Sequence, residues 1–276
     1  MNNTEKFFAS GKGLFLWLEY VYNEGRNKSK SGDNMNINQL SKRLEHVVNY
    51  IPKGSIVADI GSDHAYLPCF AVKKGIAKKA IAGEVAEGPF QAAKQQVEEA
   101  ELENEISVRK GDGLEVIMPG EVDCITIAGM GGALITAILE EGKEKLQGVK
   151  RLILQPNISA INIRKWLIAH GWELIDEVIL EEDEKIYEIL VAEIGEPLKP
   201  YSEKQEQELL FGPILLKKKT EPFYKKWQRE LTQLEKVLGQ LEKAENQEQV
   251  QQKKQAIELE IQWMREVLQD ENGKRS

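Results

Sequence analysis

The stretch Val-Ala-Asp-Ile-Gly-Ser-Asp-His-Ala-Tyr at residues 57–66 decides the fold of this chain. Its first half is typical of a buried strand, and Gly61 follows that strand directly. A glycine between a first strand and a helix lets the backbone approach a nucleotide-like ligand closely. The stretch therefore predicts the first strand and the ligand-binding turn of an α/β fold.

Short apolar runs and amphipathic helical patterns alternate on either side of this turn. The runs lie at 56–60, 80–84, 106–109, 124–128 and 152–155, with helical patterns at 88–100 and 133–141. This alternation predicts right-handed βαβ units and a mostly parallel sheet that helices cover on both faces. Two more runs, around 174–180 and 187–194, are separated only by a turn at 181–184, so the last strand is expected to be antiparallel.

Heptads replace the strands after residue 201. Apolar residues at spacings of four and three occupy Trp227, Leu231, Leu234, Leu238 and Leu241, and the register continues at Val250, Ile257, Ile261, Met264 and Leu268. A short polar segment, Ala244–Glu248, separates the two series. We expect an antiparallel coiled-coil hairpin. The predicted domains are therefore a sheet domain at 35–195 and an α-helical coiled-coil domain at 196–276.

The first 34 residues differ from the rest of the chain. An apolar patch at 14–18 precedes a polar stretch at 27–34 that resembles a linker. A signal peptide is the alternative, but Glu19 interrupts the apolar run and no small-residue cleavage site follows it. We interpret residues 1–34 as a leader, non-native or disordered, with Met35 as a plausible start of the native protein.

Composition excludes several classes of protein. The 276 residues contain no apolar run near the roughly 20 residues that a membrane span needs. Two cysteines form neither a disulfide framework nor a four-ligand zinc site, so a reducing cytoplasm and no metal are expected. The net charge of −8 argues by itself against a nucleic-acid partner. The excess negative charge lies within 35–195, which carries 17 basic and 26 acidic side chains.

Acidic side chains follow the first two strands, where an open parallel sheet binds its ligands. Asp63 stands where a dinucleotide fold would have a second glycine, and its carboxylate would repel a diphosphate. S-adenosylmethionine carries no phosphate and has two cationic groups that carboxylates would attract. Helix capping is the alternative role for Asp63. Glu84, followed by Val85, lies about 20 residues beyond the glycine and can accept hydrogen bonds from both ribose hydroxyls.

Glycines mark the ends of the next strands. Asp112 and Gly113 form either an ordinary turn or a contact with an adenine amino group. The run Ala128-Gly129-Met130-Gly131-Gly132 indicates a tight turn, and it also leaves space and exposed backbone amides for a base. Gln155-Pro156-Asn157 ends the fifth strand and offers side-chain amides to a flipped base.

These motifs together resemble the bacterial tRNA (adenine-22-N1)-methyltransferases. The resemblance rests on Ser41–Leu44, Ala58–Pro68, Gly111–Leu114, Ile127–Gly132 and Leu154–Asn157, and it extends from about Met35 to the C-terminus. It implies a class I, Rossmann-like methyltransferase sheet with a C-terminal coiled coil, S-adenosylmethionine as the methyl donor, and N1 of a tRNA adenine in the D-arm region as the acceptor.

The resemblance also assigns roles to residues. Asp63 is the catalytic candidate. The expected cofactor-binding residues are Asp59, Gly61, Glu84, Val85, Asp112, Gly113, Ala128 and Gly129. The expected substrate-binding residues of the sheet domain are Arg43, His64, Tyr66, Met130, Gly131, Gly132 and Asn157.

Local basic patches answer the objection that the chain is acidic overall, because phosphate contacts need only clustered Lys and Arg. The densest patch contains Lys217, Lys218, Lys225 and Lys226, and a solvated helix face is its alternative interpretation. A second patch combines Lys42-Arg43 with Lys73-Lys74 and Lys78-Lys79, which we expect near the mouth of the sheet. The expected partner is tRNA, with no membrane, no obligate protein partner and a monomeric state.

Two other functions stay open on the sequence alone. A methyltransferase of the same fold could act on another RNA base or on a protein. A non-catalytic RNA-binding adaptor could retain an unused cofactor pocket, although the presence of Gly61, Glu84 and Asp112 argues against that.

Overall fold

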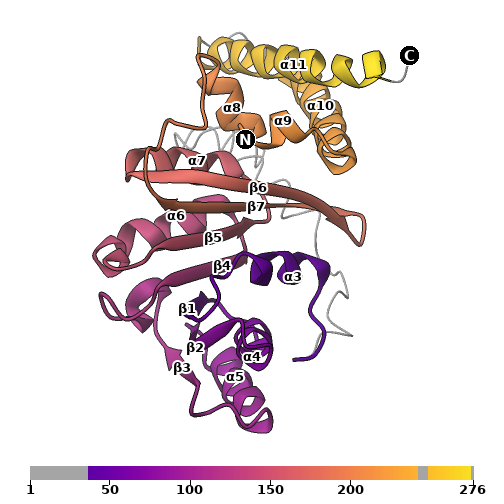
Figure 1. The fold of residues 1–276 in the computed structure, drawn as a ribbon. Coiled ribbons are helices and arrows are strands. Elements are labelled where there is room, and N and C mark those ends of the chain that lie inside the picture. The colour runs from indigo at the N-terminus through magenta and orange to yellow at the C-terminus, as the bar shows by residue number, and fades with distance from the viewer. Residues whose placement is uncertain (1–36, 242–247, 275–276) are drawn as a thin grey trace, which may run out of the picture.

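A seven-stranded sheet forms the centre of the protein, with strand order β3-β2-β1-β4-β5-β7-β6 (Figure 1). The computed structural model describes residues 37–241 and 248–274. Parallel pairing joins the first five strands, which are β1 (Ser55–Ile60), β2 (Ala77–Glu84), β3 (Ile106–Lys110), β4 (Cys124–Met130) and β5 (Arg151–Pro156). The predicted Rossmann-like topology is therefore confirmed, and the expected leader at 1–34, with Met35, lies outside the described residues.

The last two strands form a long hairpin of β6 (Trp172–Glu182) and β7 (Lys185–Ile194). β7 pairs antiparallel with both β5 and β6, as the short predicted turn required. Its pairing with β5 ends at Leu190, whereas its pairing with β6 continues to Lys185. The hairpin therefore extends beyond the carboxyl end of β5, and Figure 1 shows its tip projecting past the neighbouring strands.

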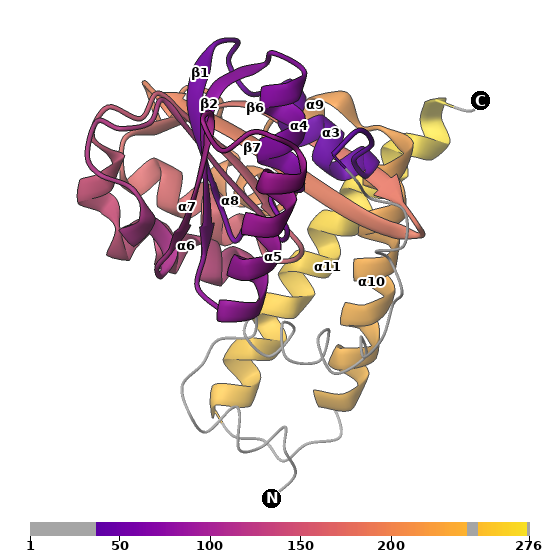
Figure 2. The ribbon, with the colours of Figure 1, turned by 90° about the horizontal axis from the view of Figure 1, so that it is seen from below.

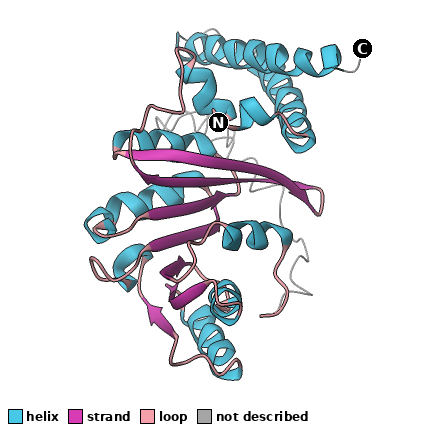
Figure 3. Cartoon of the chain, viewed as in Figure 1, coloured by secondary structure: helices cyan, strands magenta, loops and turns pink. Residues whose placement is uncertain are grey.

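Helices cover both faces of the sheet (Figure 3). One face packs against α3 (Lys42–Asn49), α4 (Tyr66–Lys73) and α5 (Glu87–Glu99). The other packs against α6 (Gly132–Glu141), α7 (Ala160–Ala169) and the short 3-10 helix η1 (Gly113–Val116), with a second 3-10 helix, η2 (Lys143–Leu146), nearby. This double burial explains why most residues of β1 and β4 are apolar. No helix within the described residues is both long and apolar enough to cross a bilayer.

Only helices follow β7 in the described part of the chain. They are α8 (Gln205–Phe211), α9 (Leu215–Lys218), α10 (Glu221–Leu241) and α11 (Glu248–Lys274). Figure 2 shows α10 and α11 side by side. The predicted heptad residues Trp227, Leu234, Ile257, Ile261 and Met264 are buried there. Residues 244–247 of the predicted polar turn lie outside the described residues.

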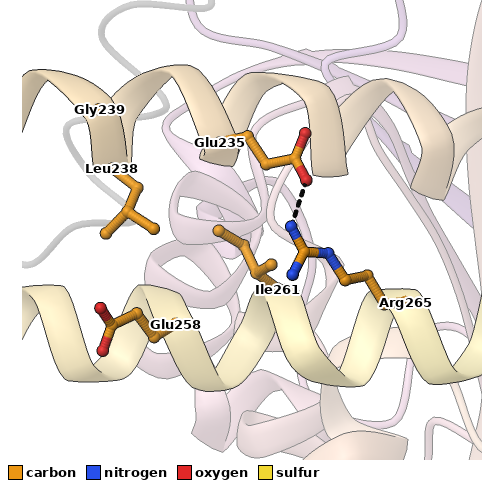
Figure 4. Close-up of a pocket in the computed structure, with 6 residues that line it drawn as sticks. All are labelled: Glu235, Leu238, Gly239, Glu258, Ile261 and Arg265. Atoms are coloured by element: carbon orange, nitrogen blue, oxygen red, sulfur yellow. Dashed lines mark hydrogen bonds and ion pairs between the residues drawn. The ribbon is translucent and has the colours of Figure 1, made fainter.

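A shallow groove separates α10 from α11 on one side of this helix pair (Figure 4). Leu238 and Ile261 line it together with an ion pair in which Arg265 Nη2 lies 2.8 Å from Glu235 Oε1. Both side chains of this pair are exposed, so the bridge contributes at most about 1 kcal/mol. The apolar contacts at the seam therefore hold the two helices together.

A buried ionic cluster connects the sheet to the C-terminal helices. Arg164 of α7 donates from Nε to Glu177 of β6 at 2.7 Å and from Nη2 to Glu188 of β7 at 2.6 Å. Burial opposes the Arg164 charge, but the two carboxylates outweigh it and raise the pKa of Arg164. Glu177 also accepts from the backbone N–H of Ile214, and Glu188 accepts from Lys226 of α10. The two carboxylates therefore link β6 and β7 to α9 and α10.

Replacement of Arg164 should reveal how much the fold depends on this cluster. Arg164→Met leaves buried Glu177 without an ion-pair partner and Glu188 with Lys226 alone, and we expect the free energy of unfolding to fall by about 3–5 kcal/mol. Arg265→Met, which removes an exposed pair, should cost less than about 1 kcal/mol. Urea denaturation of both variants measures the difference. Equal losses would contradict a structural role for the buried cluster.

Candidate active site

The carboxyl ends of the parallel strands bring the predicted site residues to one edge of the sheet. In the order of the strands, this edge carries Asp112 after β3, Glu84 on β2, Asp59 on β1, Gly129 on β4 and Gln155 on β5. The strand order reverses between the parallel strands β1 and β4, which is the position where open α/β sheets bind ligands. The structure therefore brings together residues that are almost 100 positions apart in sequence.

Asp59 lies at the base of the site and is 4% exposed. Its carboxylate accepts from Ser62 Oγ at 2.7 Å and from Thr126 Oγ1 at 2.5 Å. Burial raises the pKa of Asp59, and the two hydroxyl donors oppose that shift. Both of its oxygens are already engaged, so this geometry favours a supporting role for Asp59 over a direct ligand contact.

The loop after β1 has an unusual backbone. Gly61 has a φ of 69°, and Asp63, His64 and Ala65 continue in the left-handed region with φ values of 42°, 65° and 55°. Non-glycine residues adopt this region rarely and at a cost of roughly 1–3 kcal/mol each. Glu84 offsets part of that cost, because its Oε1 accepts from the backbone N–H of Asp63 at 2.5 Å.

Asp63 projects from this strained loop with its side chain 76% exposed. The first residue before α4 is Ala65, which provides no side-chain cap, so Asp63 does not have the helix-capping role that was its alternative. The Asp63 carboxylate instead lies 2.7 Å from His64 Nδ1. The His64 ring stacks on Tyr66, with centroids 5.5 Å apart. An accessible carboxylate and two aromatic rings therefore share the mouth of the site.

Glu84 and Val85 make the end of β2 suitable for a nucleoside. Glu84 is almost buried, and burial raises its pKa although the Asp63 N–H opposes this. Its Oε2 accepts no hydrogen bond from the residues that the structure describes. Val85, in contrast, is 60% exposed. A free carboxylate oxygen beside an uncovered apolar side chain fits a ribose hydroxyl next to an adenine ring.

Asp112 and Gly113 lie at the next strand end. Gly113 has a φ of 51°, and a Cβ there would lie 3.0 Å from the Ile138 side chain. The backbone N–H of Asp112 donates to Glu115 at 3.0 Å, which fixes the start of η1. The turn interpretation is therefore correct, and the Asp112 carboxylate is exposed at the same edge.

The backbone groups of the glycine run after β4 mainly form hydrogen bonds within the protein. Gly129 has a φ of 81°, its N–H donates to Gln155 Oε1 at 3.0 Å, and its carbonyl accepts from Asn157 Nδ2 at 2.7 Å. Gly132 donates to the Ile158 carbonyl, and a Cβ at Gly132 would lie 2.2 Å from the Ser159 carbonyl oxygen. The expectation that amides of this run are exposed for a base is wrong for Gly129 and Gly132, because protein atoms already accept from them.

The other members of this run are placed as follows. Met130 accepts from the backbone N–H of Asn157 at 2.7 Å, and its side chain lies against Gly61, where a Cβ would be 2.2 Å from Met130 Cε. Gly131 precedes α6, and Ala128 lies on β4 beside Gln155. These contacts join the two ligand-side turns.

Gln155 is the site residue whose importance the sequence did not reveal. It is fully buried, and its Oε1 accepts from Arg43 Nη1 as well as from Gly129. Arg43 also lies over the Tyr187 ring, 5.3 Å from its centroid. The only sequence signal was a polar amide in an otherwise apolar strand.

The structure gives the two predicted basic patches different surroundings. In the first, Lys218 contacts Asp176, Lys225 contacts Glu181, and Lys226 contacts Glu188, whereas Lys217 is exposed and makes no ion pair with the described residues. These pairs hold α9 and α10 to the β6–β7 hairpin.

The second patch is partly in the wrong place. Lys73 and Lys74 end α4, and Lys78 and Lys79 begin β2, so all four lie at the amino end of the parallel strands. The expectation that they lie near the mouth is therefore wrong, because α4 runs away from the mouth along β1 and β2.

The chemistry of the site fits S-adenosylmethionine better than a dinucleotide. Asp59, Asp63 and Glu84 surround the β1 turn with carboxylates, which would repel a diphosphate and attract a sulfonium and an ammonium group. Within residues 37–241 and 248–274, no group of three or more His, Cys, Asp or Glu side chains is arranged to hold a metal ion.

Comparison with known proteins agrees with this geometry. A family model for tRNA (adenine(22)-N(1))-methyltransferase matches residues 57–266. The tRNA (adenine(22)-N(1))-methyltransferase of Bacillus subtilis (strain 168) is 54% identical over 235 residues, which are 85% of this chain and 99% of that protein. The crystal structure of the B. subtilis M1A22 tRNA methyltransferase matches with a TM-score of 0.80 and 53% identity, covering 84% of this chain and 99% of that one.

A third protein extends the comparison to a bound ligand. The M. capricolum TrmK structure, in complex with S-adenosyl-homocysteine, matches with a TM-score of 0.69 and 26% identity, covering 83% of this chain and 98% of that one. Sequence, fold and the carboxylate-rich edge all agree, and the chain therefore belongs to the tRNA (adenine(22)-N(1))-methyltransferase family.

Proposed function

We propose that this protein transfers a methyl group from S-adenosylmethionine to N1 of the adenine at position 22 of tRNA. Family membership over most of the chain supports this function. The observation that carries it within the structure is the accessible Asp63 carboxylate, on a loop whose backbone Glu84 holds at the carboxyl edge of the parallel strands. The relatives are enzymes, which argues against the alternative of a non-catalytic adaptor.

The residues of the strand ends would hold the cofactor in a defined order. Glu84 would accept from the ribose hydroxyls, Val85 would contact the adenine ring, and Asp112 would accept from its amino group. Gly61 lets the loop backbone approach closely, and Gly113 and Gly129 supply the turns on either side. When bound, S-adenosylmethionine supplies an electrophilic methyl group.

Asp63 is the residue that we assign to the chemistry. Adenine N1 lies on the Watson–Crick edge, so the base must leave its stack at a cost of a few kcal/mol. Alkylation of N1 makes the ring cationic until a proton leaves N6. A carboxylate near N6 stabilises that charge and can accept the proton, a contribution of typically 10²–10⁴-fold. The Asp63 carboxylate accepts a hydrogen bond from His64 Nδ1, which keeps the carboxylate oriented.

The remainder of the rate enhancement comes from holding the base and the methyl donor in position. Holding N1 in line with the methyl donor can lower the barrier by roughly 7–11 kcal/mol. Tyr66 and His64 offer ring faces to an extruded base, and Asn157 offers an amide. Met130, Gly131 and Gly132 fix the turn that lies beside them.

We also propose that residues 196–276 form a coiled-coil domain that contacts tRNA. The buried seam of α10 and α11 supports an antiparallel coiled coil, and Lys217 is an exposed cation near its base. The protein is proposed to act as a monomer in the cytoplasm. Free, buried Cys69 and Cys124 are compatible with a reducing compartment.

Mass mapping of tRNA digests tests the function and the role of Asp63 together. The wild-type protein, given S-adenosylmethionine and unmodified tRNA, should produce one methylated adenosine at position 22. Asp63→Ala should slow single-turnover methylation about 10²–10⁴-fold, because the base loses its carboxylate. Calorimetric titration should find the affinity for S-adenosyl-homocysteine changed by no more than a few-fold.

Two results would count against these assignments. Methylation of another base, or of protein, would replace tRNA adenine 22 as the substrate. Equal losses of cofactor affinity and turnover in Asp63→Ala would make Asp63 a cofactor ligand only.

The salt dependence of tRNA binding tests the proposed phosphate contacts. Affinity should fall steeply between low and moderate salt, because bound phosphates release counterions. Lys217→Ala should weaken binding and reduce the slope of log affinity against log salt by about 1. The control is Lys150→Ala, which removes an exposed cation paired with Asp123 at the amino ends of β4 and β5 and should leave the slope unchanged. An unchanged slope in Lys217→Ala would exclude that contact.

A further inference from the structure

Five exposed lysines gather at the amino ends of β1 and β2, on the edge of the sheet opposite the active site. They are Lys53 in the loop before β1, Lys73 and Lys74 at the end of α4, and Lys78 and Lys79 at the start of β2. The backbone N–H of Gly54 donates to the Ile76 carbonyl at 2.7 Å. The loop before β1 therefore lies against the turn between α4 and β2, and the five lysines belong to one surface.

This group of lysines is a local excess of positive charge in an acidic domain. None of the five ammonium groups forms an ion pair with the residues that the structure describes. Other exposed lysines of the sheet domain lie beside carboxylates, as Lys143 does beside Glu140 and Lys150 beside Asp123. Neighbouring ammonium groups repel one another, so the surface favours an anionic partner that relieves this repulsion.

One face of α4 connects the lysines to the mouth of the site. Phe70 lies four residues after Tyr66, and Lys73 and Lys74 follow one turn later, so all four share one face of the helix. Most of the other residues of α4 are buried. Lys74 Nζ lies 5.5 Å from the centroid of the Phe70 ring, which gives this cation a defined position. The face begins at Tyr66, which stacks with His64 at the mouth, and it ends at the lysines. We call this face, together with the five lysines, the α4 surface.

The dimensions of the α4 surface suit the backbone of a nucleic acid. A helix of eight residues is about 12 Å long. A strand of a duplex carries one phosphate about every 3.4 Å. An RNA that extrudes one base into the mouth and continues along α4 therefore brings phosphates a few nucleotides away from that base to the lysines.

An anionic membrane is the other partner that a lysine surface could have. Peripheral membrane binding generally combines lysines with apolar side chains that enter the lipid. None of the exposed large apolar side chains in the described part of the chain belongs to the α4 surface. The lack of apolar anchors and the continuity with the mouth both favour RNA.

We propose that the α4 surface binds the sugar-phosphate backbone of the substrate tRNA, away from the adenine that is methylated. Contacts of this kind set the affinity and orientation of the RNA and do not read its sequence. The lysines take no part in the chemistry, because the length of α4 separates them from Asp63. This inference rests on the proposed function, since the partner is the substrate of that function.

Removal of three of these charges tests the proposal. Lys73→Ala/Lys74→Ala/Lys78→Ala should weaken tRNA binding about 10- to 100-fold at low salt and reduce the slope of log affinity against log salt by about 2 to 3. In steady-state methylation, the KM for tRNA should rise by a similar factor, whereas kcat should change less than about twofold, since the mouth is untouched. Calorimetric titration should find the affinity for S-adenosyl-homocysteine changed less than about twofold, which also shows that the variant is folded.

A matched variant controls for the loss of net charge. Lys143→Ala/Lys150→Ala/Lys199→Ala also removes three exposed lysines, each of which is already paired with a carboxylate elsewhere in the structure. The salt slope of this variant should equal that of the wild type.

Four outcomes would overturn the inference. A wild-type salt slope in the first variant would exclude phosphate contacts at the α4 surface. An equal fall of the slope in both variants would show an effect of net charge alone. A loss of kcat without a rise in KM would mean that the lysines act on the chemistry. Binding of the wild type to vesicles of phosphatidylglycerol, lost in the first variant while its tRNA affinity stays unchanged, would assign the surface to a membrane.

The proposed function fails by a different result. A wild-type protein that does not methylate tRNA would overturn that function. The comparison of tRNA affinities does not depend on turnover, so it tests the α4 surface separately.

Discussion

Two buried carboxylates hold the turn between β1 and α4, and the rest of the site depends on that turn. The Asp59 carboxylate accepts hydrogen bonds from Ser62 and Thr126, and the Glu84 carboxylate accepts one from the backbone N–H of Asp63. Without these bonds, three consecutive left-handed residues would have no compensation for their strain. The strain exposes the Asp63 side chain at the mouth of the sheet. The same carboxylates also give the site its negative charge. The residues that hold the turn therefore also favour a cationic ligand.

A second ionic cluster positions the helical part of the molecule against this site. Arg164, Glu177 and Glu188 are buried where α7, β6 and β7 meet α9 and α10. Gly212 has a φ of 91° there, and a Cβ would lie 2.8 Å from Arg164 Nη2. Ile214 donates its backbone N–H to Glu177 and Lys226 pairs with Glu188, so contacts of this cluster cross the proposed domain boundary. The relative position of the sheet and the first C-terminal helices is thereby fixed, and Lys217 with it.

Much of the fold could be predicted from periodicity. In strand runs such as 124–128 and in the heptads of α10, most residues that the sequence pattern marks as buried are buried in the structure. The pattern exists because one face of each element must be buried. The run Asp63-His64-Ala65 could not be predicted in this way. Residue propensities do not indicate a left-handed stretch without glycine, because the hydrogen bond that stabilises it comes from Glu84, which is distant in sequence. The placement of Lys73 and Lys78 failed for a related reason, because sequence proximity to a motif does not reveal which end of a helix or strand faces the ligand.

Gln155 and Lys226 illustrate how tertiary contacts decide roles. Gln155 looked like one of several amides for a base, but its burial and its two donors make it an internal support for Arg43. Lys226 looked like a phosphate ligand, yet its ammonium group contacts buried Glu188. A polar side chain in a pattern thus indicates a candidate, and its partners in three dimensions determine what it does.

We propose that the acidic edge of the sheet binds a phosphate-free nucleoside cofactor whose cationic groups lie near Asp63 and Glu84. A crystal structure with S-adenosyl-homocysteine bound measures this directly. We expect the ribose hydroxyls on Glu84 and the sulfur facing the turn that carries Asp63. A ligand bound in the reverse direction, or outside the edge formed by β1, β2 and β4, would contradict it.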